Sequence, residues 1–189
     1  MLDNNDYYIY PLIFLRNFIE PLPGLPDGME ELLPWELTRK LPDIIMLMMK
    51  DLNDEYTITA GVAIHHSAIV DRNSVIKGPA IISEDCFVGM NVLLRDGIFL
   101  GSGSRIGPGC EIKMSLIGNH TSIAHFNFIG DSLIGHHVNF EAGAIIANHF
   151  NERENKMISV MLDGQPIETG VTKFGALVGD DCKIGANAQ

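Results

Sequence analysis

The sequence lacks any long apolar run. Its longest stretches of this kind are 7–15, which Pro11 interrupts, and 44–49, whereas a membrane-spanning helix needs about 20 apolar residues. The chain also opens on the acidic segment 1–6 rather than on the basic and apolar pattern of a secretory signal. We therefore expect a soluble, cytoplasmic protein that has no membrane partner.

Cysteine and positive charge are also scarce. The three cysteines, Cys86, Cys110 and Cys182, are odd in number and far apart, so we interpret them as reduced, buried thiols. Lys and Arg number 13 against 24 Asp and Glu, a net charge of −11. Because nucleic-acid phosphates are held by a surplus of Lys and Arg, we expect no nucleic-acid partner. An anionic small substrate would need a few local cations.

The second part of the chain, from about residue 61, contains a repeat of period six. Every sixth residue from 64 to 112 is aliphatic, namely Ile64, Val70, Ile76, Ile82, Val88, Leu94, Leu100, Ile106 and Ile112. After two steps back by one residue, the ladder continues through Ile117, Ile123, Ile129, Ile134, Phe140 and Ile146, and it reappears at Val178 and Ile184. Small or compact side chains stand four residues after many of these positions.

A period of six fits neither a half-buried strand nor an amphipathic helix. A triangular coil with three short faces explains it, because one aliphatic side chain per face then points inward and stacks on its equivalent in the next coil. The sequence therefore predicts an all-β fold, a left-handed parallel β-helix of hexapeptide repeats, with a short helical segment before it.

We place a domain boundary near residues 60 and 61. Residues 1–60 form an irregular and helical extension, in which apolar residues at helical spacing predict a helix over about 35–52. Pro42 lies inside this helix and should kink or split it.

Residues 61–189 form the β-helix. An excursion at about 149–172 interrupts the ladder, and the pair Asp163–Gly164 predicts a hairpin turn within it. The chain ends in mid-repeat, so we expect the last coil to meet a partner or to continue into further coils.

The stretch 113–148 carries the motif with chemical content. It contains His125-x2-Phe128-x-Gly-Asp, followed by Asn139 and Asn148, and the run 172–187 continues it. This part resembles the acetyltransferase domain of the bifunctional UDP-N-acetylglucosamine pyrophosphorylase/glucosamine-1-phosphate N-acetyltransferase family, in the manner of the archaeal sugar-phosphate nucleotidylyltransferases. The resemblance implies acetyl-CoA as co-substrate, an amino-sugar phosphate as acceptor, and a homotrimer with sites between subunits.

The resemblance also implies roles for single residues. His125 falls on the catalytic histidine, which takes a proton from the substrate amine as the amine attacks a thioester carbonyl. The unperturbed pKa of histidine in general, about 6.5, suits this task. Arg95 and Lys113 fall on cations that bind the sugar phosphate. The other implied substrate-binding positions are Phe128, Asn139, Asn148 and Lys156. The implied acyl-donor positions are Ala142 and Ala186.

The sequence departs from the family at several of these positions. Phe128 replaces a tyrosine and so lacks a hydroxyl group, Glu141 replaces a glycine, and Ala186 replaces a small polar residue. Residues 1–60 are too short for the family's nucleotidylyltransferase domain and lack its Gly-rich loop, so we expect no such activity from this chain. A separate nucleotidylyltransferase is then a candidate partner.

Two other hypotheses compete with an acyltransferase. The first is a non-catalytic trimeric assembly or ligand-binding module, in which His125 is a corner histidine that faces solvent. The second is a metal site like that of the γ-class carbonic anhydrases, which use a pair spaced like His120-x4-His125. That family has a third histidine upstream, where this chain has 83–85, Ser-Glu-Asp. We therefore expect no metal in the site.

Overall fold

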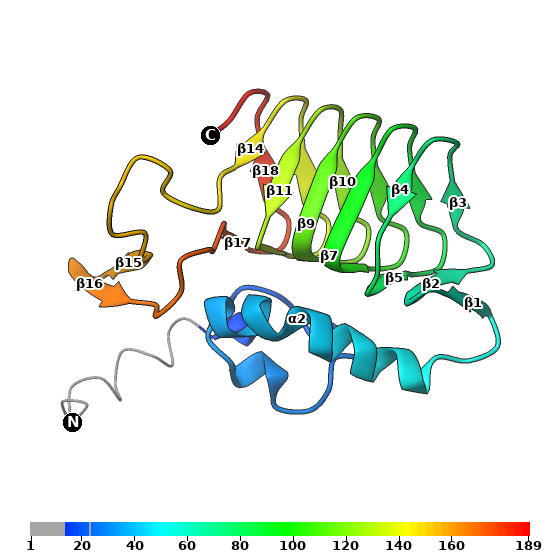
Figure 1. Cartoon of the computed structure of the whole chain (residues 1–189), viewed down its shortest axis with the longest axis horizontal. Helices are drawn as coiled ribbons and strands as arrows, with labels where there is room; N and C mark the ends of the chain where they lie inside the picture. Colours follow the sequence, from blue (N-terminus) through cyan, green and yellow to red (C-terminus); the bar gives the residue numbers. More distant parts are fainter. Residues whose placement is uncertain (1–13, 23) are drawn as a thin grey trace.

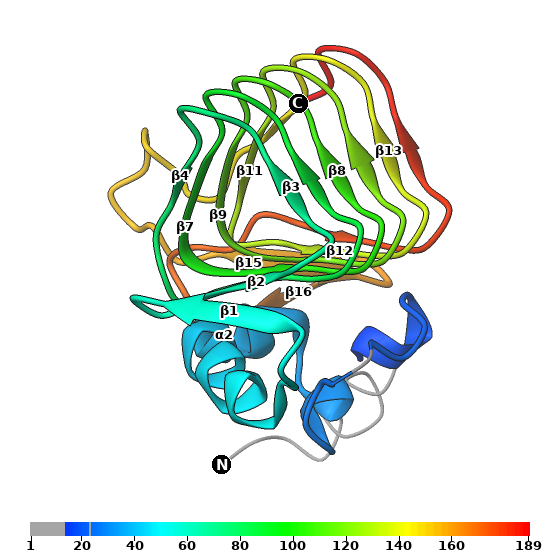
Figure 2. The same cartoon turned by 90° about the vertical axis from the view of Figure 1, so that its right-hand side faces the viewer.

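The computed structural model describes residues 14–22 and 24–189, and it shows a left-handed parallel β-helix with a helix packed along one side (Figure 1). Seen along the axis, the coils stack as triangles (Figure 2). The fold class predicted from the period of six is confirmed.

The described helices are η2 (Leu15–Asn17), η3 (Met29–Glu31), α2 (Pro34–Met48) and η4 (Met49–Asp51). The strands of the first coils are β1 (Tyr56–Thr59), β2 (Val62–His65), β3 (Ile69–Val70), β4 (Val75–Ile76), β5 (Ala80–Ile82), β6 (Phe87–Val88), β7 (Leu93–Leu100), β8 (Arg105–Ile106) and β9 (Glu111–Ile117). The later strands are β10 (Ser122–Ile123), β11 (Phe128–Gly130), β12 (Leu133–Ile134), β13 (Asn139–Phe140), β14 (Ile145–Ile146), β15 (Ser159–Leu162), β16 (Gln165–Glu168), β17 (Leu177–Val178) and β18 (Lys183–Ile184).

The coils have three faces. The helix face consists of β2, β5, the second halves of β7 and β9, β12 and β17. The six-stranded face consists of β3, β6, β8, β10, β13 and β18. The third face consists of β4, the first halves of β7 and β9, β11 and β14. Strands β7 and β9 therefore run around the corner between the third face and the helix face.

The predicted ladder is the core of the β-helix. Most of its members are fully buried and pack into one cluster, from Ile82 through Leu94 to Phe140. The ladder is less buried in the first coil, where Val70 is 36% exposed, because a terminal coil has only one neighbour to stack on.

At one corner, the compact side chains beside the ladder also form hydrogen bonds to the backbone of the next coil. The Cys86 Sγ, Ser104 Oγ and Thr121 Oγ1 atoms donate hydrogen bonds of 3.1, 2.6 and 2.7 Å to carbonyl oxygens of the next coil. Burial raises the pKa of the Cys86 thiol to about 11. The interpretation of the cysteines as reduced thiols fits the structure, in which Cys86 and Cys110 are buried and Cys182 is half-buried.

Helix α2 covers the helix face, as both views show (Figures 1 and 2). It begins with Pro34, and the Glu36 carboxylate accepts a 3.2 Å hydrogen bond from the Leu33 N–H. Its apolar side, which includes Leu37 and Leu41, packs against residues that point outward from the coils. These outward residues are Ala63, Ile81, Phe99, Leu116, Leu133 and Leu177. The predicted helix over 35–52 is confirmed, with its α-helical part ending at Met48 and the 3-10 helix η4 continuing to Asp51.

Pro42 does not split this helix, which runs unbroken from Pro34 to Met48. The proline ring lies over Gly97 at the corner of β7, where a Cβ atom would come within 3.0 Å of the Pro42 Cγ atom. Gly97 also has a φ of 109°, a conformation that favours glycine. Packing against this corner therefore outweighs the local tendency of proline to interrupt a helix.

The excursion from the β-helix contains the predicted hairpin. Strands β15 and β16 pair antiparallel, and the turn residues Asp163 and Gly164 have φ values of 48° and 78°, as a two-residue turn of this type requires. The chain then returns to the coils through Phe174, whose ring packs edge-on against Trp35 with centroids 6.0 Å apart.

The segment before α2 contacts the last coil. The Phe18 carbonyl accepts a 3.0 Å hydrogen bond from the Asp180 N–H, and the Asp180 carboxylate accepts one of 2.8 Å from the Glu20 N–H. No helix among residues 14–22 and 24–189 is long and apolar enough to cross a membrane.

The packing of α2 gives a first prediction. Leu41 is fully buried, whereas Leu47 on the same helix is 44% exposed. We expect Leu41→Ala to lower the free energy of unfolding by about 2–5 kcal/mol, because the change leaves a cavity against the coils. Leu47→Ala should change it by about 0.5 kcal/mol or less. Urea unfolding of both variants checks this, and equal losses would contradict the packing described.

Candidate functional site

His125 lies at the corner between the six-stranded face and the third face. Its side chain is exposed, and it lines a shallow pocket of about 240 Å³ together with Asn139, Arg105 and Gly107. A Cβ atom at position 107 would clash with the Ala124 carbonyl group and lie 3.2 Å from the His125 Nδ1 atom, so the glycine lets the backbone before His125 lie close to the neighbouring coil. The His125 carbonyl accepts a 2.9 Å hydrogen bond from the Gly143 N–H, which fixes the backbone of the corner.

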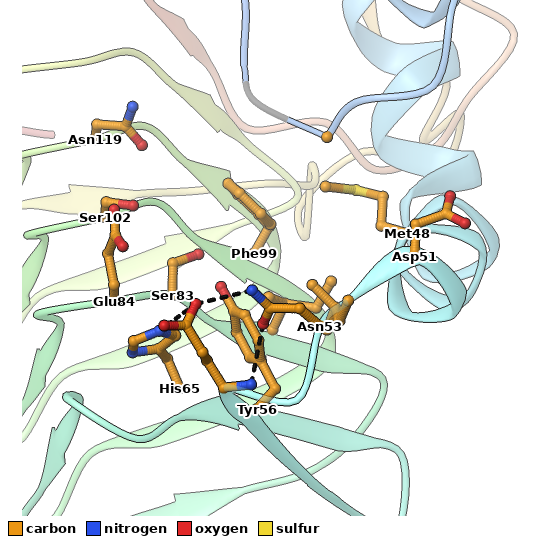
Figure 3. Close-up of a pocket in the computed structure, with 14 residues that line it drawn as sticks. Met48, Asp51, Asn53, Tyr56, His65, Ser83, Glu84, Phe99, Ser102 and Asn119 are labelled. Carbon is orange, nitrogen blue, oxygen red and sulfur yellow. Dashed lines mark hydrogen bonds and ion pairs between the residues drawn. The ribbon is translucent and has the colours of Figure 1, made fainter.

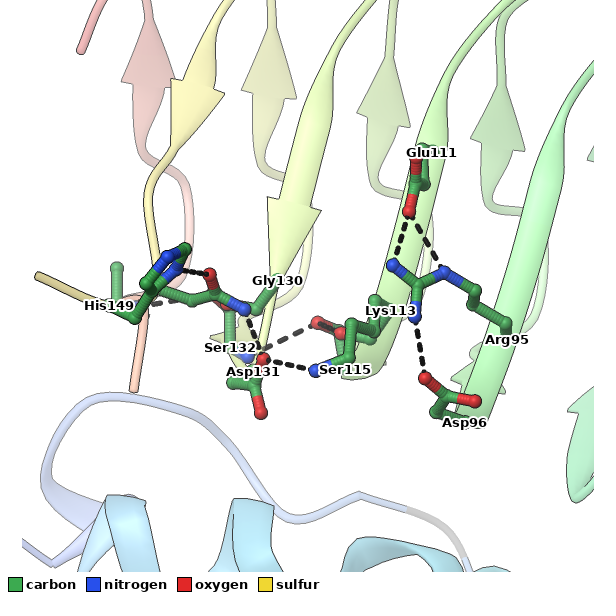
Figure 4. A network of polar contacts seen from close by, with 11 residues as sticks. Arg95, Asp96, Glu111, Lys113, Ser115, Gly130, Asp131, Ser132 and His149 are labelled. Atoms are coloured by element: carbon green, nitrogen blue, oxygen red, sulfur yellow. Dashed lines mark hydrogen bonds and ion pairs between the residues drawn. The ribbon is translucent and has the colours of Figure 1, made fainter. Parts of the chain in front are cut away.

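Lys113 belongs to a buried network at another corner, where the third face meets the helix face (Figure 4). It is 8% exposed, and its Nζ atom lies 3.0 Å from the Asp131 Oδ2 atom. The Asn148 amide donates to the same carboxylate oxygen, and the Asn148 Oδ1 atom is 3.2 Å from the His149 Nδ1 atom. The predicted residues Lys113 and Asn148 thus meet through Asp131, which the sequence analysis did not assign to the site.

Arg95 is the register partner of Lys113 on the adjacent coil. Its guanidinium binds Glu111 through two N–H groups at 2.6 and 2.9 Å and Asp96 through a third at 2.6 Å (Figure 4). The hydrogen bonds that the guanidinium donates to Glu111 are the main cause of a raised Arg95 pKa. Both predicted phosphate-binding cations are therefore paired with carboxylates of this chain.

The remaining predicted residues lie in three places. Phe128 is on the third face between Glu111 and Ile145. Ala142 and Ala186 are at the His125 corner of the last two coils, and the Ala186 N–H donates a 3.0 Å hydrogen bond to the Glu141 carboxylate. Lys156 is exposed in the excursion, where its Nζ atom is 3.4 Å from two backbone carbonyls of its own loop.

The structure thus divides the predicted site residues between two corners. His125 and Asn139 share one pocket, and Lys113 lines another, with Asp131 and Lys173. The third face lies between these corners, and the pockets that contain the two groups share none of their described lining residues. The Gly-Asp pair of the motif was the signal that could have identified Asp131.

A third pocket, of about 320 Å³, lies beside the first coils and the end of α2 (Figure 3). The carboxylates of Asp51, Glu55 and Glu84 line it. The Tyr56 side chain also lines it, and burial raises the pKa of that phenol. Since none of its described lining residues is Lys or Arg, this pocket is unsuited to a phosphate.

The histidine pair that suggested a metal site is spread over two corners. Strand β10 lies between His120 and His125 in the chain, and the His120 ring stacks on His137 with centroids 5.2 Å apart. Among residues 14–22 and 24–189, no group of three or more His, Cys, Asp or Glu side chains is arranged to hold a metal ion.

Comparison with known proteins agrees with this architecture. The family model described as the GMPPB C-terminal domain matches residues 58–159, more than half of the chain. The chain therefore belongs to the GMPPB C-terminal domain family.

Several curated relatives carry names that fit the resemblance seen in the motif, which is thereby confirmed. A "Bifunctional protein GlmU" of Methanococcus maripaludis is 35% identical over 80% of this chain and 37% of its own length. A protein of the same name from Clostridium tetani is 26% identical over 100% of this chain and 48% of its own length. A "Bifunctional sugar-1-phosphate nucleotidylyltransferase/acetyltransferase" of Sulfurisphaera tokodaii is 34% identical over 62% of this chain and 33% of its own length. The chain thus spans less than half of the length of these relatives.

The buried network gives a second prediction. Lys113→Met should lower the free energy of unfolding by about 3–5 kcal/mol, because it leaves the Asp131 carboxylate buried without its cation. The double variant Lys113→Met/Asp131→Asn should recover most of this loss. Arg16→Met, which breaks an exposed 2.8 Å pair with Glu31, serves as the control and should cost less than about 1 kcal/mol. If the double variant is as unstable as Lys113→Met, the pair does not have the role described.

Proposed function

We propose that this chain is an acyl-CoA-dependent N-acetyltransferase that acts on an amino-sugar phosphate such as glucosamine-1-phosphate. The observation that carries the proposal is the His125 corner, where an exposed imidazole and the Asn139 side chain line one pocket. Membership of the GMPPB C-terminal domain family and the names of the relatives support it.

In the proposed reaction the amine nitrogen of the sugar attacks the thioester carbonyl carbon of acetyl-CoA. His125 acts as the general base and accepts the proton that the amine loses. The C–N bond forms, the C–S bond breaks, and the coenzyme A thiolate takes the proton from the imidazolium. Backbone N–H groups of neighbouring coils would stabilise the negative charge on the carbonyl oxygen.

The proposed active form is a homotrimer. Its support is the separation of the predicted residues, because His125 and Lys113 line different pockets on opposite sides of the third face. A site between two subunits would bring the His125 corner of one copy to the Lys113 corner of another. Sedimentation of the purified protein tests the assembly.

A non-catalytic ligand-binding module is the second candidate. Two observations favour it: the pairing of Arg95 and Lys113 with Glu111 and Asp131, and the missing hydroxyl group at Phe128. Such a protein would form a folded trimer that assembles or binds a ligand without releasing coenzyme A.

The third prediction concerns the base. With acetyl-CoA and glucosamine-1-phosphate, His125→Ala should lower kcat about 10²- to 10⁴-fold, the usual contribution of a general base. Release of the coenzyme A thiol measures the rate. His66→Ala, which removes another exposed histidine at a corner of the first coil, should leave it unchanged. A folded wild-type trimer without turnover would favour the binding module, and equal rates for both variants would remove His125 from the mechanism.

The fourth prediction concerns the missing hydroxyl group. Phe128→Tyr should lower KM for the acceptor phosphate about tenfold or more, because a hydrogen bond to a charged group is worth about 1.5–3 kcal/mol. The same change at Phe126, which is 71% exposed, is the matched control and should have no effect. An unchanged KM in Phe128→Tyr would show that position 128 does not contact the acceptor.

A further inference from the structure

Three cations line one pocket beside the buried network. Arg39 comes from helix α2, Lys113 from β9, and Lys173 from the end of the excursion. The pocket has a volume of about 380 Å³, and its other lining residues are Thr38, Met114, Asp131, Gly170, Val171 and Thr172. Arg39 and Lys173 both lie outside the matched region 58–159, so the pocket combines the family's coils with segments beyond the match.

The charges around this pocket do not cancel. Asp131 is the only acidic residue among the described lining residues, and it is paired with Lys113 at 3.0 Å. Arg39 and Lys173 have no carboxylate within ion-pair distance among residues 14–22 and 24–189. The pocket is therefore locally positive in a chain whose net charge is −11, and a local surplus of this kind attracts an anion.

Packing of helix α2 fixes the backbone positions from which the exposed side chains of Arg39 and Lys173 extend. Arg39 lies between Leu37 and Leu41, which are fully buried against the coils. The residue after Lys173 is Phe174, whose ring packs against Trp35 of the same helix. Because the backbone at both positions is anchored by one packed helix, a ligand that meets both cations has to order two side chains but not a free loop.

We propose that Arg39 binds the phosphate group of a phosphate monoester in this pocket, so that the N-terminal helix is part of the acceptor site. A guanidinium presents two parallel N–H groups to a phosphate, whereas an ammonium acts as a point charge. The proposal rests on the proposed function for the identity of the ligand as a sugar phosphate. Arg39 then selects phosphorylated sugars over neutral ones.

The fifth prediction tests this assignment with glucose-1-phosphate, which has no amine to accept an acetyl group. Arg39→Gln should weaken its binding about tenfold to a hundredfold, since the lost hydrogen bonds involve two charged groups. Lys40→Gln removes the same charge from the next, exposed residue of α2, which does not line the pocket, and should bind as the wild type does. Arg39→Lys should recover part of the affinity. Titration calorimetry on the purified, assembled protein measures all four dissociation constants.

Unfolding midpoints of the Arg39 and Lys40 variants should match, because both side chains are exposed. Equal affinity of wild type and Arg39→Gln, an equal loss in Lys40→Gln, or no binding of glucose-1-phosphate by the wild type would each overturn the assignment. If Arg39 is required for binding but glucosamine-1-phosphate is not acetylated, the phosphate site stands and the transferase proposal fails.

Discussion

The stacking of one aliphatic side chain per face on its equivalent in the next coil is the constraint on which the rest of the structure depends. It fixes the register between coils, because the inward residues Leu94, Ile112 and Ile129 must align. Residues beside the ladder are then aligned as well, and this register sets Arg95 next to Lys113. The corners are consequently columns of side chains, and each candidate site residue within the coils has a neighbour that this register assigns to it.

Features that depend on a local pattern were predictable from the sequence. Features that depend on contacts between segments distant in sequence were not. The ladder, the helix over α2 and the hairpin at Asp163–Gly164 each follow from a period or a turn motif, and the structure contains all three. The continuity of the helix through Pro42 depends on Gly97, which is distant in sequence. The pairing of Lys113 with Asp131 depends on how two successive coils turn the same corner. The role of His125 remains a prediction, although its exposure and its shared pocket with Asn139 fit that role.

The cations predicted from the family resemblance are paired with carboxylates, whereas the cations that α2 and the end of the excursion contribute are not. Arg95 and Lys113 are the cations that the resemblance predicts to bind phosphate, but their charges are already opposed by Glu111, Asp96 and Asp131. A ligand that met only these two cations would have to compete with carboxylates that are held at hydrogen-bonding distance. Positive charge without such competition comes from α2 and from the end of the excursion. Segments added around a repetitive scaffold can therefore change its affinity for anions without altering the coils.

Helix α2 occupies one of the three sides of the solenoid. A triangular solenoid offers three flat sides to other molecules, and here one of them already packs against Leu37, Leu41 and their neighbours. The segment before α2 also reaches the last coil through Glu20 and Asp180, so this cover extends along most of the axis (Figure 1). Among the described residues α2 leaves the other two sides of the coils uncovered, and a ring of three copies that met through these sides would carry its helices on the outer rim.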